Sequence, residues 1–161
     1  MAKDNRIAGV VLVVFFGIIL QLLLGMADTR STPGKTAVEF TKAYFGLDAS
    51  MSEYICNDLM EEENIVEKYI NQVTQEAQNL GFKSNYMRSM LYHIKTDIIS
   101  RDESEAKIRI TCERKRLINP LFTIVGKLFF IGETYEVDET LNIIKEDGKW
   151  KICGRAFSLP V

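Results

Sequence analysis

The feature that most constrains this chain is an apolar run near its amino terminus. Residues 7–27 contain no Asp, Glu, Lys or Arg, and Lys3 and Arg6 stand shortly before them. A secretory signal has an apolar region of about 7–15 residues, whereas a helix needs about 20 apolar residues to cross a bilayer. The length therefore predicts a retained transmembrane anchor over residues 1–27. Gly25 and Ala27 leave removal open as the alternative, because small residues are typical of a cleavage site.

The flanking charges predict how such an anchor is oriented. Basic residues favour the cytoplasmic side of a span. Lys3 and Arg6 therefore place the amino end inside and the rest of the chain outside a cell membrane that it crosses once, although Arg30 and Lys35 compete on the far side. The domain is then extracytoplasmic, and periplasmic in a bacterium.

Small residues and one amide share a stripe of the predicted anchor. Gly9, Gly17, Gln21 and Gly25 are separated by multiples of four residues. Small residues let membrane helices approach closely, and an amide can hydrogen-bond between helices. The stripe predicts packing against a second copy or another membrane subunit. The alternative is that glycine is common in such helices and that Gln21 reaches the interface.

The rest of the chain has the composition of one globular domain. A polar linker over residues 28–34 precedes a domain over residues 35–161. The chain is 47% hydrophobic and 26% charged, with a formal net charge of -2. This charge argues against nucleic acid as a partner, because contact with phosphates requires a basic surface.

Helical periodicity opens the domain. Residues 35–46 carry apolar side chains at three- and four-residue steps, and Gly46 suits the end of a helix. Ser50 and Glu53 then have the spacing of a capping box.

A second, longer helix is predicted over residues 65–80, where a wide apolar stripe ends at Gly81. The acidic residues 61–63 precede it, and the helix dipole favours negative charge at that position. The dipole accounts for these carboxylates, so no metal site is predicted.

From about Tyr92 the apolar period changes from 3.6 to 2, which is typical of strands. Strands are predicted over residues 92–98, 105–116, 134–144 and 150–157. Asp147 and Gly148 form a strong hairpin signal between the last two. Helices followed by an antiparallel meander predict an α+β fold, with the helices packed on one side of a curved antiparallel sheet.

The opening of the domain, TAVEFTKAYFGLDASMSEYICNDL, resembles domains similar to nuclear transport factor 2, which have the cystatin-like cone fold. Such domains also close with a hairpin like IIKEDGKWKICGRAF. The family includes isomerases, dehydratases, small-ligand binders and assembly subunits, so the resemblance implies no single function. A membrane-anchored outer domain of this kind resembles the scaffold subunits of bacterial secretion machines. The expectation is a non-catalytic scaffold or accessory subunit of a membrane complex.

The alternative is a small-ligand-binding or enzymatic pocket inside the cone. The resemblance implies that active members use acidic, tyrosine or histidine side chains that point inward. Glu139 is the carboxylate that alternation places inward, and a buried carboxylate is a plausible general base. Arg114 on the preceding strand is placed to pair with it, and Tyr44 and Tyr92 would complete a polar pocket.

The remaining reactive side chains predict little chemistry. His93 shares a strand face with Lys95 and Asp97, which alternation places outward, and no cofactor is predicted. Cys56, Cys112 and Cys153 lack metal-ligand spacing. Alternation places Cys112 and Cys153 on opposite faces, so the prediction is three free thiols.

An apolar insertion over residues 118–132 departs from a plain cone domain. Phe122 and Phe130 make it apolar on both faces, with Lys127 inside it and Arg116 just before it. One interpretation is a strand or loop packed under the helices. The other is an exposed element, formed by these four residues, that docks on a partner subunit or the bilayer.

Overall fold

The computed structural model describes residues 11–22, 31–61, 64–116, 134–157 and 159. The chain divides into two units, Met1–Ser31 and Thr32–Val161, which are described separately. In the first unit, residues 11–22 form an α-helix with exposed side chains. Among the described residues, no helix combines the length and the apolar character needed to cross a membrane. The span predicted over residues 7–27 extends beyond the described helix at both ends.

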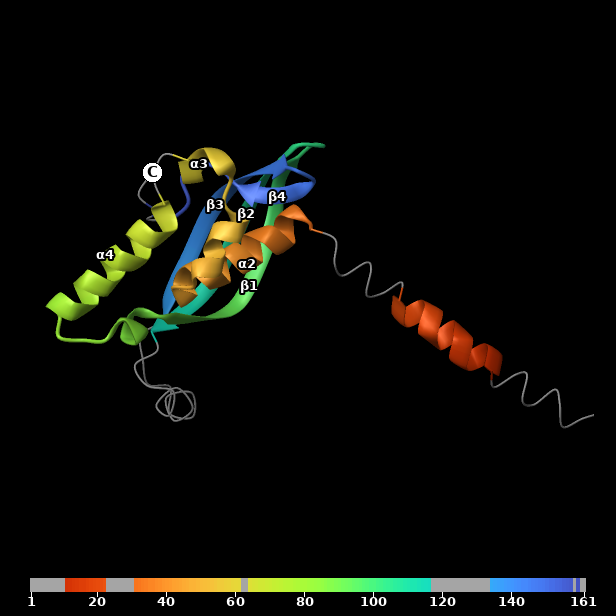
Figure 1. Ribbon diagram of the computed structural model, residues 1–161, viewed down its shortest axis with the longest axis horizontal. Helices are drawn as coiled ribbons and strands as arrows, with labels where there is room; N and C mark the ends of the chain where they lie inside the picture. Colours follow the sequence, from red (N-terminus) through yellow and green to blue (C-terminus); the bar gives the residue numbers. More distant parts are fainter. Residues whose placement is uncertain (1–10, 23–30, 62–63, 117–133, 158, 160–161) are drawn as a thin grey trace, which may run out of the picture. The chain divides into compact units, whose positions relative to one another are not determined.

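The second unit has the predicted α+β class: helices pack on a four-stranded antiparallel sheet in the order β1-β2-β3-β4 (Figure 1). The helical elements are α2 (Pro33–Gly46), η1 (Ala49–Tyr54), α3 (Asn57–Glu61), α4 (Ile65–Asn79) and η2 (Ser84–Met87). The strands are β1 (Ser89–Arg101), β2 (Glu105–Arg116), β3 (Tyr135–Glu146) and β4 (Lys149–Ile152).

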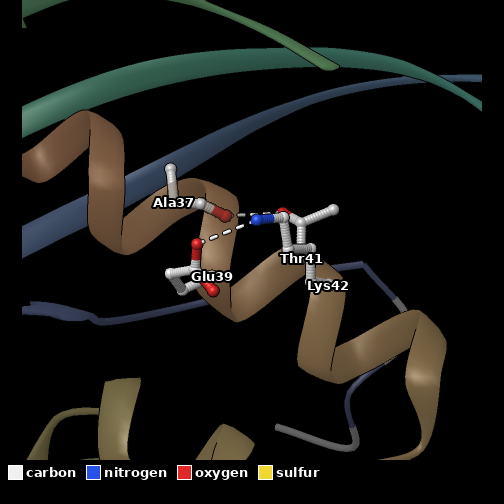
Figure 2. A network of polar contacts seen from close by, with 4 residues as sticks. All are labelled: Ala37, Glu39, Thr41 and Lys42. Carbon is white, nitrogen blue, oxygen red and sulfur yellow. Dashed lines mark hydrogen bonds and ion pairs between the residues drawn. The ribbon is translucent and has the colours of Figure 1, made fainter. Parts of the chain in front are cut away.

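Helix α2 has one buried and one exposed face, as its periodicity predicts. Figure 2 shows both kinds of polar contact on this helix. The buried Thr41 hydroxyl donates to the Ala37 carbonyl at 2.7 Å, which satisfies it inside the core. On the exposed side, Lys42 donates to the Glu39 carboxylate at 2.9 Å, three residues earlier.

The ends of the helices only partly follow the predictions. Gly46 is the last residue of α2, but Leu47 adopts the left-handed conformation that closes it, with φ 51°. The predicted capping box is wrong: Ser50 donates its backbone N–H to the Asp48 carboxylate at 2.9 Å, because this segment is a short 3₁₀ helix capped by Asp48. Gly81 follows α4 with φ 76°, as expected at a helix end.

Strand β2 has the predicted bounds, and the turn before β4 has positive φ at Asp147 and Gly148, as the hairpin prediction requires. Strand β4 ends at Ile152, earlier than predicted. The positive φ of Gly154 (89°) and Phe157 (50°) takes the chain out of the extended conformation there.

The core lies between the helices and one face of the sheet, which we call the inner face. Ala106, Ile108 and Ile110 from β2 and Leu141 and Ile143 from β3 are all nearly inaccessible on this face. Helical residues cover them, led by the fully buried Phe40 and Met51.

The prediction of three free thiols is wrong, because Cys56 and Cys153 form a disulfide with Cα atoms 5.3 Å apart. Ile55 pairs with Ile152 in a single parallel bridge, and the Cys56 N–H donates to the Ile152 carbonyl at 2.9 Å. This bridge places the two following cysteines side by side at the sheet edge. Strand alternation did not predict the pairing, since Cys56 precedes all the strands. Cys112 alone is free, and it is buried.

Candidate functional site: a polar pocket beside strand β3

A pocket of about 420 Å³ is lined by the end of α2, the middle and later part of α4, and the start of β3. Pockets of about 300–1,000 Å³ accept small ligands in other proteins. The helices contribute Tyr44, Phe45, Leu47, Tyr69, Val73, Glu76 and Met87 to its lining. The sheet and the C-terminal segment contribute Ser89, Arg114, Arg116, Glu136, Val137, Asp138, Glu139 and Phe157.

One wall of the pocket is an aromatic stack centred on Tyr44. The Tyr44 ring stacks on Tyr69 at 4.6 Å and on Phe157 at 4.7 Å, and it meets Phe45 edge-on at 5.0 Å. These contacts join α2, α4 and the C-terminal segment. Burial raises the pKa of Tyr69, and a hydrogen bond with Tyr44 raises it further. The Tyr69 phenol is therefore a neutral hydrogen-bonding group at physiological pH.

The pocket lining also carries a cation, next to this aromatic stack. The Arg114 guanidinium lies 5.4 Å from the Phe45 ring centroid and 5.3 Å from that of Tyr135, so two rings hold it in place. Among the residues that the structure describes, no carboxylate forms an ion pair with Arg114. Arg116 lies two residues further along β2 and lines the same pocket. Two guanidinium groups therefore face this space.

Glu139 lies on the inner face, as predicted, and is half-buried. Its register partner is Ile110, with Val137 and Leu141 two residues to either side on β3. The ion pair expected between Glu139 and Arg114 does not form among the described residues. Both side chains line the pocket instead.

Asp138 contributes to the pocket lining but its carboxylate points elsewhere. Arg109 binds it on the outer face, with an Nε to Oδ1 distance of 2.7 Å. That guanidinium lowers the pKa of Asp138, and the carboxylate in turn raises the pKa of Arg109. The charges that remain for the pocket are therefore those of Arg114, Arg116, Glu139 and the acidic residues Glu76 and Glu136.

The structure brings three of the four predicted pocket residues together and leaves Tyr92 out of this pocket. Tyr44, Arg114 and Glu139 line the pocket, whereas Tyr92 does not. An irregularity in the β1–β2 register between Tyr92 and Lys95 inserts one extra residue, with His93 at φ 51°. This bulge reverses the alternation, so Tyr92 pairs with Glu113 on the outer face.

His93 lies outside the pocket, as predicted. Its side chain is 74% exposed and lies 3.3 Å from the Glu113 carboxylate. Among the described residues, no group of acidic, histidine or cysteine side chains could hold a metal ion.

The other predicted sites are only partly described. Gly17 and Gln21 lie one turn apart on the helix of residues 11–22, and Gly9 and Gly25 lie outside the described residues. Phe122, Lys127 and Phe130 also lie outside them. Arg116, predicted as part of the same docking element, ends β2 and lines the pocket.

Sequence reasoning missed Tyr69 and Phe157 as pocket residues. Tyr69 belongs to the apolar stripe of α4, where it could not be told from a core residue. Phe157 reaches Tyr44 because its own backbone has positive φ, which sequence does not indicate for phenylalanine.

No family model matches the chain, and no curated protein is significantly similar to it.

Proposed function

We propose that this chain is a membrane-anchored, extracytoplasmic protein whose domain binds a small polar ligand in the pocket beside β3. The observation that carries the proposal is the Arg114 guanidinium in the pocket lining, which contacts two aromatic rings, forms no ion pair with any described residue and is accompanied by Arg116. The domain is proposed to have the cone fold of nuclear-transport-factor-2-like proteins. Its helices on a four-stranded antiparallel sheet are compatible with that fold.

Two features support an extracytoplasmic location. The Cys56–Cys153 disulfide is of a kind that persists in oxidising compartments and is rare in the cytosol. The charge-free run over residues 7–27 and the basic residues before it independently favour an anchored chain with its domain outside.

The pocket chemistry favours a ligand with an anionic group. A carboxylate or phosphate can accept hydrogen bonds from the Arg114 guanidinium, and such charge-assisted bonds are strong. Glu139 can accept a hydrogen bond from an amine or hydroxyl on the same molecule. An amino acid or a similar small zwitterion has both groups and fits about 420 Å³.

The test is a binding titration on the full chain in mild detergent. Amino acids, dicarboxylates and sugar phosphates are titrated by calorimetry, and any molecule that co-purifies from native membranes is identified by mass spectrometry. We expect Arg114→Gln to lower the affinity for the bound class at least tenfold, about 1.4 kcal/mol. Arg109→Gln is the matched control, because Arg109 lies on the outer face with Asp138. Equal affinities for the two variants would contradict the proposal.

Binding without catalysis is part of the proposal. The sole histidine of the sequence lies outside the pocket. Glu139→Gln is expected to change affinity only. Turnover of a bound molecule that disappears in a fully folded Glu139→Gln variant would instead show an enzyme with Glu139 as its base.

A second candidate is a scaffold or accessory subunit of a membrane complex. The specific observation that favours it is the exposure of two consecutive large apolar residues on β1, Ile98 (59%) and Ile99 (56%), because exposed apolar surface often marks a contact site. Co-purification of other membrane subunits with the full chain tests it. The predicted docking element around Phe122 and Phe130 belongs to this candidate and stays a prediction.

A further inference from the structure

The long edge strand β1 offers its second side for pairing. β1 is at one end of the strand order and pairs only with β2 within the described part of the chain. Register irregularities at Tyr92/Lys95 and at Ile98/Ser100 bound one regular stretch, residues 95–98. Edge strands are usually protected from association by bulges and charges, so a regular stretch with an exposed isoleucine is unusual. Ile98 is that residue, at 59% exposure.

A series of alternating charges crosses the outer face of the sheet and reaches its last member, Asp97, on this edge strand. Asp97 is the register partner of Arg109 on β2, and Arg109 binds Asp138 on β3. Asp97 also contributes to the raised pKa of Arg109. Asp97, Arg109 and Asp138 therefore form a row of alternating negative, positive and negative charge across β1, β2 and β3. A positive charge beyond Asp97 would continue it.

Within residues 95–98, only Lys95 has a positive side chain that could supply this charge. It lies on the outer face, as Asp97 does, and its register partner on β2 is the neutral Thr111. Lys95 and Asp97 are two residues apart with Thr96 between them. A second copy of the same strand, running antiparallel, would place its Lys95 opposite Asp97 and its Asp97 opposite Lys95.

From this we infer that β1 pairs with β1 of a second copy around a two-fold axis at Thr96, which joins the described sheets of the two copies into one continuous sheet. Cross-strand partners in such a pair have residue numbers that sum to 192, so Lys95 lies opposite Asp97 twice and Thr96 lies opposite its own copy. Opposite charges and β-branched pairs both stabilise antiparallel strands, by about 0.2–1 kcal/mol each. The strand that pairs with the free edge of β1 is thus β1 of a second copy of the same chain.

Neighbouring registers are less favourable for electrostatic reasons. Directly opposed side chains of an antiparallel pair lie on the same face of the sheet. A two-fold axis normal to the sheet therefore requires that one residue lies opposite its own copy, and that residue is the centre of the pair. Centring the pair at Lys95 or at Asp97 places like charges directly opposite each other. Centring it at Ile98 places Lys95 opposite Arg101. Thr96 is the centre in this stretch that pairs opposite charges.

The test uses the full chain in mild detergent with Thr96→Cys under mild oxidation. At the two-fold centre the two Cα atoms would lie about 4.5–5.5 Å apart, which suits a disulfide. We expect most of the protein to form a reducible covalent dimer. Thr140→Cys is the matched control, since Thr140 is exposed on β3 away from the edge. Cross-linking of Thr96→Cys no greater than that of the control would overturn the inference.

The register has its own test. In the Thr96→Cys background, Lys95→Glu should reduce the dimer yield at least tenfold, while Lys95→Arg should retain it. Equal yields would overturn the charge-paired register. Hydrogen exchange of the unmodified chain gives a measurement without cysteines: amides of residues 94–98 should be protected more at high protein concentration, and Ile98→Lys should abolish this difference. Exchange independent of concentration would contradict self-association at β1.

Discussion

The two ends of the sheet differ in what fills the space beneath the helices. At the closed end, where β3 and β4 pair, Ile143, Trp150 and Ile152 are almost inaccessible, and the Cys56–Cys153 disulfide ties the helical segment to the edge. At the pocket end, where β2 ends and β3 begins, Arg114 and Glu139 are only half-buried and border a cavity. The same inner face thus changes along its strands from a close-packed core to a polar site. The close-packed apolar side chains of the closed end exclude charged groups of the kind that the pocket end carries.

The comparison predicts unequal costs for truncating two residues of the same strand and face. Ile143→Ala at the closed end should lower the free energy of unfolding by about 2–5 kcal/mol, because it leaves a cavity in close-packed surroundings. Val137→Ala at the pocket end should cost about 1 kcal/mol, since Val137 is half-buried beside existing space. Urea unfolding measures both. Equal losses would show that the two ends are packed alike.

Removal of the disulfide at the closed end should cause the second-largest loss of unfolding free energy. Cys56 and Cys153 are separated by 97 residues, so their bond restricts a long loop of the unfolded chain. The double variant Cys56→Ser/Cys153→Ser should lose about 2–4 kcal/mol of unfolding free energy. Dithiothreitol should destabilise the native chain but leave the double variant unchanged. A native chain insensitive to the reductant would refute the bond's stabilising role.

Substitution of Asp48 tests how much the cap of η1, in the segment between the pocket and the closed end, contributes to stability. Asp48→Ala should cost about 1 kcal/mol, because it removes the cap of η1. The hydrogen bonds from Ser50, the backbone N–H first, hold the pKa of Asp48 below its ordinary value of 3.8. A lowered pKa contributes stability that is present above that ordinary value and is lost as pH falls through the folded-state value. Unfolding at pH 7 and pH 3 should show the difference between Asp48 and Asp48→Ala shrinking at low pH, whereas a constant difference would exclude the charge as its source.

Substitutions on the exposed face of α2 should have the smallest effect on the stability of the domain. Lys42→Ala removes the pair with Glu39, whose side chains are both substantially exposed. Such pairs contribute at most about 0.5 kcal/mol. The thermal midpoint should therefore stay nearly unchanged, and a shift of several degrees would show that α2 depends on its surface charges.

The sequence alone was sufficient for the class of fold and for much of the pocket. Periods of 3.6 and then 2 give the order of helices and strands, and alternation places Arg114 and Glu139 on the inner face. Alternation failed at Tyr92, because the bulge at His93 adds a residue that no local pattern indicates. It could not show that Arg114 and Glu139 form no ion pair with each other, since the position of the guanidinium depends on the rings of Phe45 and Tyr135 that contact it.

The periodicity of apolar residues determined the element order, the hairpin at Asp147 and Gly148, and the inner face of β2 and β3, because these follow from interactions between residues close in the chain. Only the tertiary structure decided the Cys56–Cys153 bond and the stacking of Tyr69 and Phe157 on Tyr44. Both join segments that are distant in sequence. Their contacts depend on how the helices dock on the sheet and on a positive φ at Phe157, and neither leaves a periodic trace in the amino-acid sequence.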